Sequence, residues 1–252
     1  MIASLPMYDR PETAGTIDRL WREIRARLPE GAPEVLTRDG SLWDHWGAPE
    51  LILSQTCGYP YRARLKGHVQ LVATPDNRLP GVLPGHYISV FVVRGDDRRG
   101  ILFEFADALL AFNEPLSQSG WAAPQNHAAA QGFAFGRALH TGAHLSSACA
   151  VAEGRADIAC IDAVSWRLIR RHEPFAARLR ELERTDPTPA PPFITSMAQD
   201  PGVIRAALAG GIAALSEEEQ DVIGLFGVTD LPEDDYLAVP NPAPPAAFAA
   251  DA

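Results

Sequence analysis

The chain has 252 residues, enough for one large domain or two small ones with real hydrophobic cores. Its composition, with 46% hydrophobic and 21% charged residues, is ordinary for a soluble globular protein. The net charge of −10 argues against a nucleic-acid-binding surface, which needs a basic stripe. No signal peptide is visible, and no apolar run approaches the ~20 residues that span a bilayer. We expect no membrane insertion, and a cytoplasmic protein as given, or a periplasmic one if an export signal was removed.

The first half of the chain alternates predicted strands and helices. Apolar residues recur at helical spacing between Ile17 and Leu28, and a Pro-Glu-Gly stop follows. The strongest strand is 87–94 (YISVFVVR), because it is rich in β-branched and aromatic residues. Shorter apolar runs between turn residues predict further strands at 2–5, 33–37, 51–53 and 68–74.

The second half continues this alternation. The pattern predicts helices at 101–111, 126–135, 163–171, 201–215 and 216–225. Residues 141–162 form a Gly-Ala-His turn, a small-residue helix and an apolar strand that ends in Asp162. The last dozen residues are low in complexity and predict a disordered tail. Alternating strands and helices indicate α/β layering around largely parallel sheets.

Two segments are candidates for crossings between lobes. They are the strand 87–94 and the Pro-rich return at 185–195, which cannot be a helix interior. One lobe would then comprise residues 1–88 and 193–252, and the other residues 89–192. A cleft between two such lobes is the default position for a ligand site.

Two polar turns could supply hydrogen-bond donors to an anion. Ser117, Gln118, Ser119 and Gly120 precede a predicted helix, so their N–H groups can converge on an anion, although an ordinary helix cap fits the local pattern better. A second run of donors follows a buried strand, where a simple loop is equally compatible; it consists of Ser54, Gln55 and Thr56.

Four further residues are candidates on weaker grounds. Tyr8 and Tyr87 combine an apolar ring with a polar tip, as interface aromatics do. By pattern alone, His144 fits a structural histidine and Asp162 a strand-end cap. No catalytic motif stands out, and the cysteines lack metal-type spacing. We therefore expect no catalytic residues, no metal site and no cofactor.

Several motifs occur in the order found in one protein family. They are SLPMY, LSQTCGYP, YISVFVVR, NEPLSQSGWAAPQN, GAHLSSACAVAEGRADIACID and PPFITS. With them the chain resembles the phosphate/phosphonate-type substrate-binding proteins of ABC transporters over residues 2–200. This resemblance implies an α/β, two-lobed type II periplasmic-binding-protein fold with two crossover segments.

The resemblance also implies roles for individual residues. Tyr87 and His144 match ligand-contacting residues of the family, and Asp162 matches an acid that accepts from a protonated oxygen or an ammonium group. The turn that begins at Ser117 matches the family's anion-binding turn. It departs from the usual Ser-Thr-Ser-Gly because Gln118 replaces the threonine.

We therefore expect a monomeric binding protein that closes two lobes over a small polar, oxyanionic ligand, with an ABC transporter permease as partner. Two alternatives use the same fold: a cytosolic enzyme like those of the alternative menaquinone route, and a cytosolic ligand sensor. The predicted ligand residues are Tyr8, Ser54, Gln55, Thr56, Tyr87, Ser117, Gln118, Ser119, His144 and Asp162.

Overall fold

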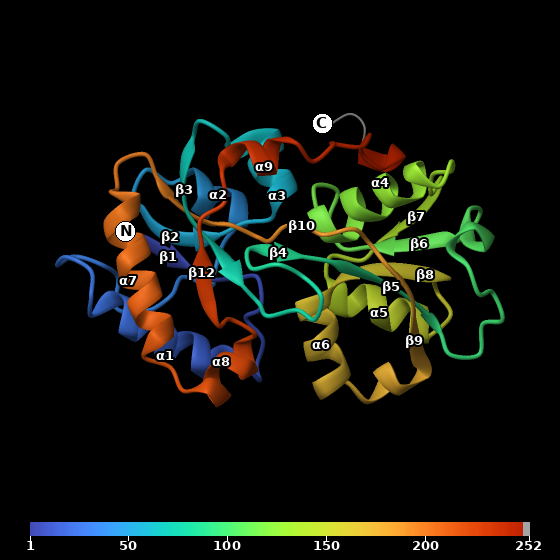
Figure 1. The fold of residues 1–252 in the computed structure, drawn as a ribbon, viewed down its shortest axis with the longest axis horizontal. Coiled ribbons are helices and arrows are strands. Elements are labelled where there is room, and N and C mark those ends of the chain that lie inside the picture. Colours follow the sequence, from blue (N-terminus) through green and yellow to red (C-terminus); the bar gives the residue numbers. More distant parts are fainter. Residues whose placement is uncertain (249–252) are drawn as a thin grey trace. The chain divides into compact units, whose positions relative to one another are not determined.

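Residues 1–248 are described by a computed structural model, and they divide into two units (Figure 1). Unit 1 comprises Met1–His86 and Pro189–Leu237, and unit 2 comprises Tyr87–Thr188 and the chain from Ala238. The chain therefore passes from one unit to the other at three places. At the first two, β4 (His86–Tyr87) pairs with β10 (Thr188–Pro189) in a two-stranded sheet.

The strands of unit 1 form a five-stranded mixed sheet. They are β1 (Ile2–Ser4), β2 (Leu51–Gln55), β3 (Val69–Asp76), β11 (Phe193–Ser196) and β12 (Gly227–Thr229). Their order is β1-β2-β11-β3-β12. β1 is parallel to β2, whereas β11 is antiparallel to both of its neighbours and β12 is antiparallel to β3.

Helices cover both faces of this sheet (Figure 1). They are α1 (Ala14–Arg25), α2 (Leu42–Gly47), α3 (Gly58–Pro60), η1 (Tyr61–Leu65), α7 (Pro201–Ala213), α8 (Glu217–Ile223) and α9 (Glu233–Leu237). The larger core contains the predicted apolar face of α1, where Leu20, Trp21 and Ile24 are at most 2% exposed. On the other face, Trp46, Tyr61 and Tyr236 pack in a separate cluster.

Unit 2 has its own five-stranded mixed sheet. Its strands are β5 (Ser89–Arg94), β6 (Leu109–Phe112), β7 (Arg137–His140), β8 (Ile158–Asp162) and β9 (Leu179–Arg184). The order is β7-β6-β8-β5-β9; β6 is parallel to β7 and β8, and β5 is antiparallel to β8 and β9. Val90 and Val92 face one core, while Phe91 stacks with rings on the opposite face, as strand alternation requires.

In unit 2, helix α4 lies on one face of the sheet, and helices α5 and α6 lie on the other face (Figure 1). The helical segments of this unit are η2 (Leu102–Phe105), η3 (Gln118–Ala122), α4 (Ala123–Ala130), α5 (His144–Ala152), α6 (Ala163–His172), η4 (Pro174–Arg178) and η5 (Ala246–Phe248).

Three secondary-structure predictions are wrong. Residues 101–111 contain the short turn η2 and the start of β6 instead of one helix. The sequence pattern is misleading here because β6 is buried between β7 and β8, so it lacks the alternation of apolar and polar residues that marks a half-exposed strand. Residues 33–37 form no strand. The helix expected at 126–135 is α4, which ends earlier, near Gly132 with its φ of +84°.

Both sheets are mixed rather than largely parallel. One strand in each unit runs antiparallel to both of its neighbours: β11 in unit 1 and β5 in unit 2. Each of these strands follows a point where the chain crosses from one unit to the other. Such a strand does not arrive through the helical crossover that makes successive strands parallel.

The C-terminal segment differs from the predicted grouping, which placed it in the first lobe and described it as disordered. Residues 238–248 belong to unit 2, because the Trp121 indole donates to the Ala243 carbonyl at 2.9 Å and the Asn126 amide donates to the Pro240 carbonyl at 2.9 Å. Phe248 packs against the Phe112 ring. The remaining four residues of the predicted tail, 249–252, lie outside the described part of the chain.

Candidate functional site

The turn at Ser117 is built as a helix cap. The Ser117 hydroxyl accepts a hydrogen bond from the Gly120 N–H at 3.0 Å, which satisfies one of the N–H groups at the start of η3. η3 is a single π-helical turn that continues directly into α4, and such turns are frequent at functional sites. The capping interpretation of Ser117 is therefore correct, and the hydroxyl of Ser119 is the one directed to another element.

Ser119, His144 and Asp162 come together in unit 2 from three elements. His144 begins α5, and its Nε2 atom lies 2.8 Å from Ser119 Oγ and 3.5 Å from Asp162 Oδ2. Asp162 ends β8 and caps α6, where its Oδ1 accepts from the Ser165 N–H at 2.8 Å. The His144 side chain is 13% exposed and that of Asp162 6%. The sequence prediction that His144 and Asp162 share one edge of the sheet is confirmed.

Burial sets the protonation of His144. Loss of hydration lowers the pKa of its imidazole, and the nearby Asp162 carboxylate only partly opposes this shift. The neutral ring therefore predominates near pH 7. An ionised carboxylate can only accept, so Asp162 favours the tautomer with the proton on Nε2. Nδ1 is then an acceptor, and it has no hydrogen-bond partner among the described residues.

Asn113 is a site residue that the sequence analysis missed. It follows β6, and its Oδ1 would lie 1.9 Å from a Cβ atom added to Gly120, so only glycine allows this approach. The buried Oδ1 atom has no hydrogen-bond partner within residues 1–248. A signal was present, since an asparagine directly after a buried apolar run sits where an α/β sheet presents polar groups to a ligand.

The predicted donors of unit 1 lie at the end of β2. Gln55 is 5% exposed, and its Nε2 donates to the Pro191 carbonyl at 2.9 Å. The Thr56 N–H donates to the Pro192 carbonyl at 3.1 Å, and the Thr56 side chain is fully buried. Ser54 is also fully buried, and its Oγ has no partner in the described part of the chain. Gln55 also lines a pocket.

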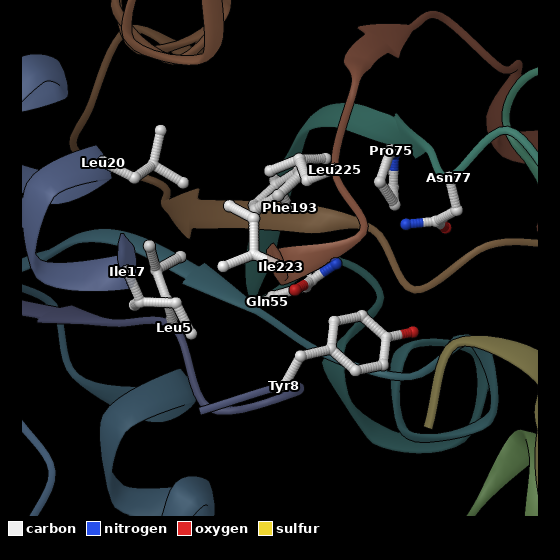
Figure 2. Close-up of a pocket in the computed structure, with 10 residues that line it drawn as sticks. All are labelled: Leu5, Tyr8, Ile17, Leu20, Gln55, Pro75, Asn77, Phe193, Ile223 and Leu225. Carbon is white, nitrogen blue, oxygen red and sulfur yellow. The ribbon is translucent and has the colours of Figure 1, made fainter. Parts of the chain in front are cut away.

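This pocket lies within unit 1, and Tyr8 forms part of its wall (Figure 2). Figure 2 shows the Tyr8 hydroxyl pointing away from the aliphatic side chains on the other side of the pocket. The lining residues are Leu5, Tyr8, Ile17, Leu20, Gln55, Pro75, Asn77, Phe193, Ile223 and Leu225.

The structure thus assembles the predicted residues in two groups. Ser117, Ser119, His144 and Asp162 form the polar cluster of unit 2, and Gln118, 1% exposed, is part of the same turn. Tyr8 and Gln55 meet in the pocket of unit 1. Tyr87 ends β4 and is 1% exposed.

The described residues offer neither a metal site nor a membrane span. Among residues 1–248, no group of three or more His, Cys, Asp and Glu side chains could hold a metal ion. Within the same residues, no helix combines the length and apolarity that a membrane span needs.

Comparison with solved structures supports the fold. PhnD1 from Prochlorococcus marinus in complex with methylphosphonate aligns with a TM-score of 0.70 and 14% identity, covering 93% of this chain and 94% of that one. XAC2383 from Xanthomonas citri bound to chloride ion aligns with a TM-score of 0.67 and 16% sequence identity, covering 93% of this chain and 92% of that one. A binding protein component of an ABC phosphonate transporter from Pseudomonas aeruginosa (PA3383) aligns with a TM-score of 0.65 and 15% sequence identity, covering 93% of this chain and 82% of that one. The predicted type II periplasmic-binding-protein fold is confirmed.

The sequence itself gives the family. No curated protein matches it. The family model described as "ABC transporter, phosphonate, periplasmic substrate-binding protein" matches residues 51–235, which is most of the chain. The chain therefore belongs to the family of periplasmic substrate-binding proteins of phosphonate ABC transporters, and its role is solute binding.

Proposed function

We propose that this protein captures a small phosphonate or a related oxyanion for uptake by an ABC transporter. The observation that carries the proposal is the cluster of Ser119, His144 and Asp162 beside the turn at Ser117. Hydroxyl groups and N–H groups at the start of a helix suit an oxyanion, because they donate hydrogen bonds along the positive end of the helix dipole.

Asp162 restricts the protonation state of that oxyanion. A buried carboxylate repels a fully ionised phosphonate, whereas it accepts a hydrogen bond from one that retains a proton. Neutral His144 does not offset this negative charge. We therefore propose that the cluster prefers a monoprotonated oxyanion, with the ligand's own proton directed to Asp162.

Unit 1 would complete the recognition of the same solute. Its contribution comes from Tyr8, Gln55 and the neighbouring Ser54 and Thr56, and Tyr87 would add a further contact next to a crossing. Binding to both units would favour a closed arrangement, as in hinge-closing binding proteins. We propose a monomer that acts in the periplasm, delivers its solute to a permease and does not transform it.

The test removes the two hydroxyl groups of the turn. We expect Ser117→Ala with Ser119→Ala to lower the affinity for methylphosphonate at least about a hundredfold in calorimetry, since each lost hydrogen bond to a charged group costs about 1.5–3 kcal/mol. Loss of the Ser117 cap would cost about 0.5–2 kcal/mol of stability, which thermal unfolding measures separately.

The matched control is Ser146→Ala, on α5 of the same unit, which should leave the affinity unchanged. A double variant that binds methylphosphonate like the wild type would show that the turn is not the oxyanion site. If the wild type binds neither methylphosphonate nor phosphate, the proposed ligand class itself is wrong.

A further inference from the structure

We propose that residues 239–245, the proline segment, act as an intramolecular ligand of unit 2 that holds the turn η3 in its conformation. The segment and the two side chains that bind it, Trp121 and Asn126, belong to unit 2, where the C-terminal chain lies beside α4 (Figure 1). The effect on solute binding rests on the proposed function, which assigns the oxyanion to the cluster around Ser119.

The sequence of the proline segment favours one extended conformation. It reads VPNPAPP, so every residue in it either is a proline or directly precedes one. Proline fixes its own φ at about −65° and restricts the residue before it to extended conformations. Together these preferences give a polyproline II helix, which has no internal hydrogen bonds and leaves its carbonyl groups free to accept. Because the segment is stiff before it docks, docking costs little conformational entropy.

Two donors of unit 2 bind carbonyl groups of the segment at a spacing that fits this helix. Asn126 Nδ2 donates to the Pro240 carbonyl at 2.9 Å, and Trp121 Nε1 donates to the Ala243 carbonyl at 2.9 Å. The two carbonyl groups are three residues apart in the sequence. Three residues make one turn of a polyproline II helix, so both groups point to the same side, about 9 Å apart. The donors belong to η3 and α4, which follow each other without a break.

Aromatic and apolar contacts extend this docking. The Trp121 and Phe112 ring centroids lie 5.1 Å apart, and Phe248, just after the proline segment, packs edge-on against Phe112 at 6.2 Å. Pro245 is buried. Aromatic-lined surfaces are a recurrent way of binding proline-rich segments. Here the ligand belongs to the same chain, which raises its effective concentration at the surface.

The docked segment supports the turn of the proposed oxyanion site. The backbone N–H of Trp121 donates to the Ser117 carbonyl at 3.2 Å, and the indole of the same residue is held by Ala243. Release of the segment would free this side chain two residues from Ser119. A π-helical turn is rare and depends on the contacts around it. Docking and solute binding should therefore favour each other, by the same factor in both directions.

The Trp121 indole N–H reports docking directly. Labelling the five tryptophans with ¹⁵N gives five indole NMR signals, and Trp121→Phe identifies the signal of Trp121. Pro242→Ala with Pro244→Ala keeps both carbonyl acceptors but makes the free segment more flexible. Each change should lower the docking equilibrium constant about two- to fivefold, so the pair should speed exchange of this indole proton with solvent about four- to twenty-five-fold. The control is Pro80→Ala with Pro84→Ala, at two exposed positions of unit 1, and it should leave the exchange rate unchanged.

Affinity for methylphosphonate tests the support of the turn. We expect Trp121→Phe, and separately the variant with both proline changes, to lower this affinity at least about threefold in calorimetry. Trp166→Phe is the matched control. Like Trp121, Trp166 is 4% exposed and lies in unit 2, and its indole donates to Glu181 at 2.9 Å. It belongs to α6, on the other face of the sheet from α4, so its loss should leave the affinity unchanged.

The reciprocal effect distinguishes coupling from a merely structural role. Saturating methylphosphonate should slow exchange of the Trp121 indole proton in the variant with both proline changes at least about threefold. A contact that only stabilises the fold would not respond to the solute in this way.

The outcomes separate the inference from the proposed function. If the wild type binds neither methylphosphonate nor phosphate, the proposed function fails, and indole exchange still tests the docking. If the two proline changes leave the exchange rate of the Trp121 indole unchanged, the segment is not a polyproline ligand and the inference is overturned. If exchange accelerates while the affinity for methylphosphonate stays at the wild-type value, the segment does not support the turn, and the inference is overturned as well.

Discussion

Replacing Gly120 by alanine tests whether the turn and the cluster are built as one packed structure. A Cβ atom at this position would lie 1.9 Å from Asn113 Oδ1 and 3.3 Å from His144 Cε1. Real Cβ atoms essentially never approach another atom within 3.0 Å, so the Asn113 side chain must move by more than 1 Å. Gly120 is buried and its N–H is hydrogen-bonded to Ser117, so its backbone cannot simply shift toward solvent.

The magnitude follows from this overlap. Inserting a methyl group into a well-packed region typically costs about 1–3 kcal/mol. In a chain of this length, each kcal/mol lowers the melting temperature by about 2–4 °C. We also expect the affinity for methylphosphonate to fall at least about tenfold, because pressure on His144 disturbs its 2.8 Å contact with Ser119.

Thermal unfolding by circular dichroism and titration calorimetry measure these two effects. Gly136→Ala is the control in the same unit: its added Cβ meets nothing within 4 Å and it should leave both quantities nearly unchanged. Combining Gly120→Ala with Asn113→Ala should recover part of the lost stability, because the two changes act on one contact. A Gly120→Ala protein that melts and binds like the wild type would refute the described packing.

Two further predictions concern helix packing and pH. Gly211→Ala should destabilise unit 1 by about 1–3 kcal/mol, because its Cβ would lie 2.6 Å from Ile24 Cγ1 and 3.1 Å from the Ile24 backbone nitrogen. Gly210→Ala should cost less, since it meets only the flexible end of Arg27, and denaturant titration compares the two. The lowered pKa of His144 means that the unfolded chain binds the proton more readily, so stability is retained above the unfolded value of about 6.5 and decreases as pH falls below it. In the His144→Gln variant, the melting temperature should depend less on pH between pH 5 and 7 than it does in the wild type.

Sequence reasoning worked where one pattern decides the structure. The apolar spacing of α1 predicted its buried face, including Trp21 and Ile24, because a surface helix must bury one stripe. The helix predicted at 216–225 is α8, and its start is stabilised by hydrogen bonds between Ser216 and Glu219 that form a capping box. The proximity of His144 and Asp162 followed from the way an α/β sheet places polar residues at strand ends.

Sequence reasoning failed where contacts between distant parts of the chain determine the structure. β6 is apolar throughout because strands flank it on both sides, and a continuous apolar run fits a buried helix equally well. The C-terminal segment looked disordered because its order comes from partners over a hundred positions away, Trp121 and Asn126. The position of Asn113 directly after β6 was a signal in the sequence, but its unpartnered amide oxygen is a property of the folded surroundings.

The arrangement around His144 explains why this cluster suits capture better than acid–base catalysis. In a Ser-His-Asp triad, the serine and the acid contact opposite nitrogens of the ring, so that the acid stabilises the imidazolium formed when the serine loses its proton. Here Ser119 and Asp162 approach the same nitrogen, Nε2. Asp162 therefore competes with Ser119 for one ring position, and burial further disfavours the charged ring. A neutral imidazole held in this way can position hydroxyl groups around an oxyanion, but it is poorly placed to activate Ser119 as a nucleophile.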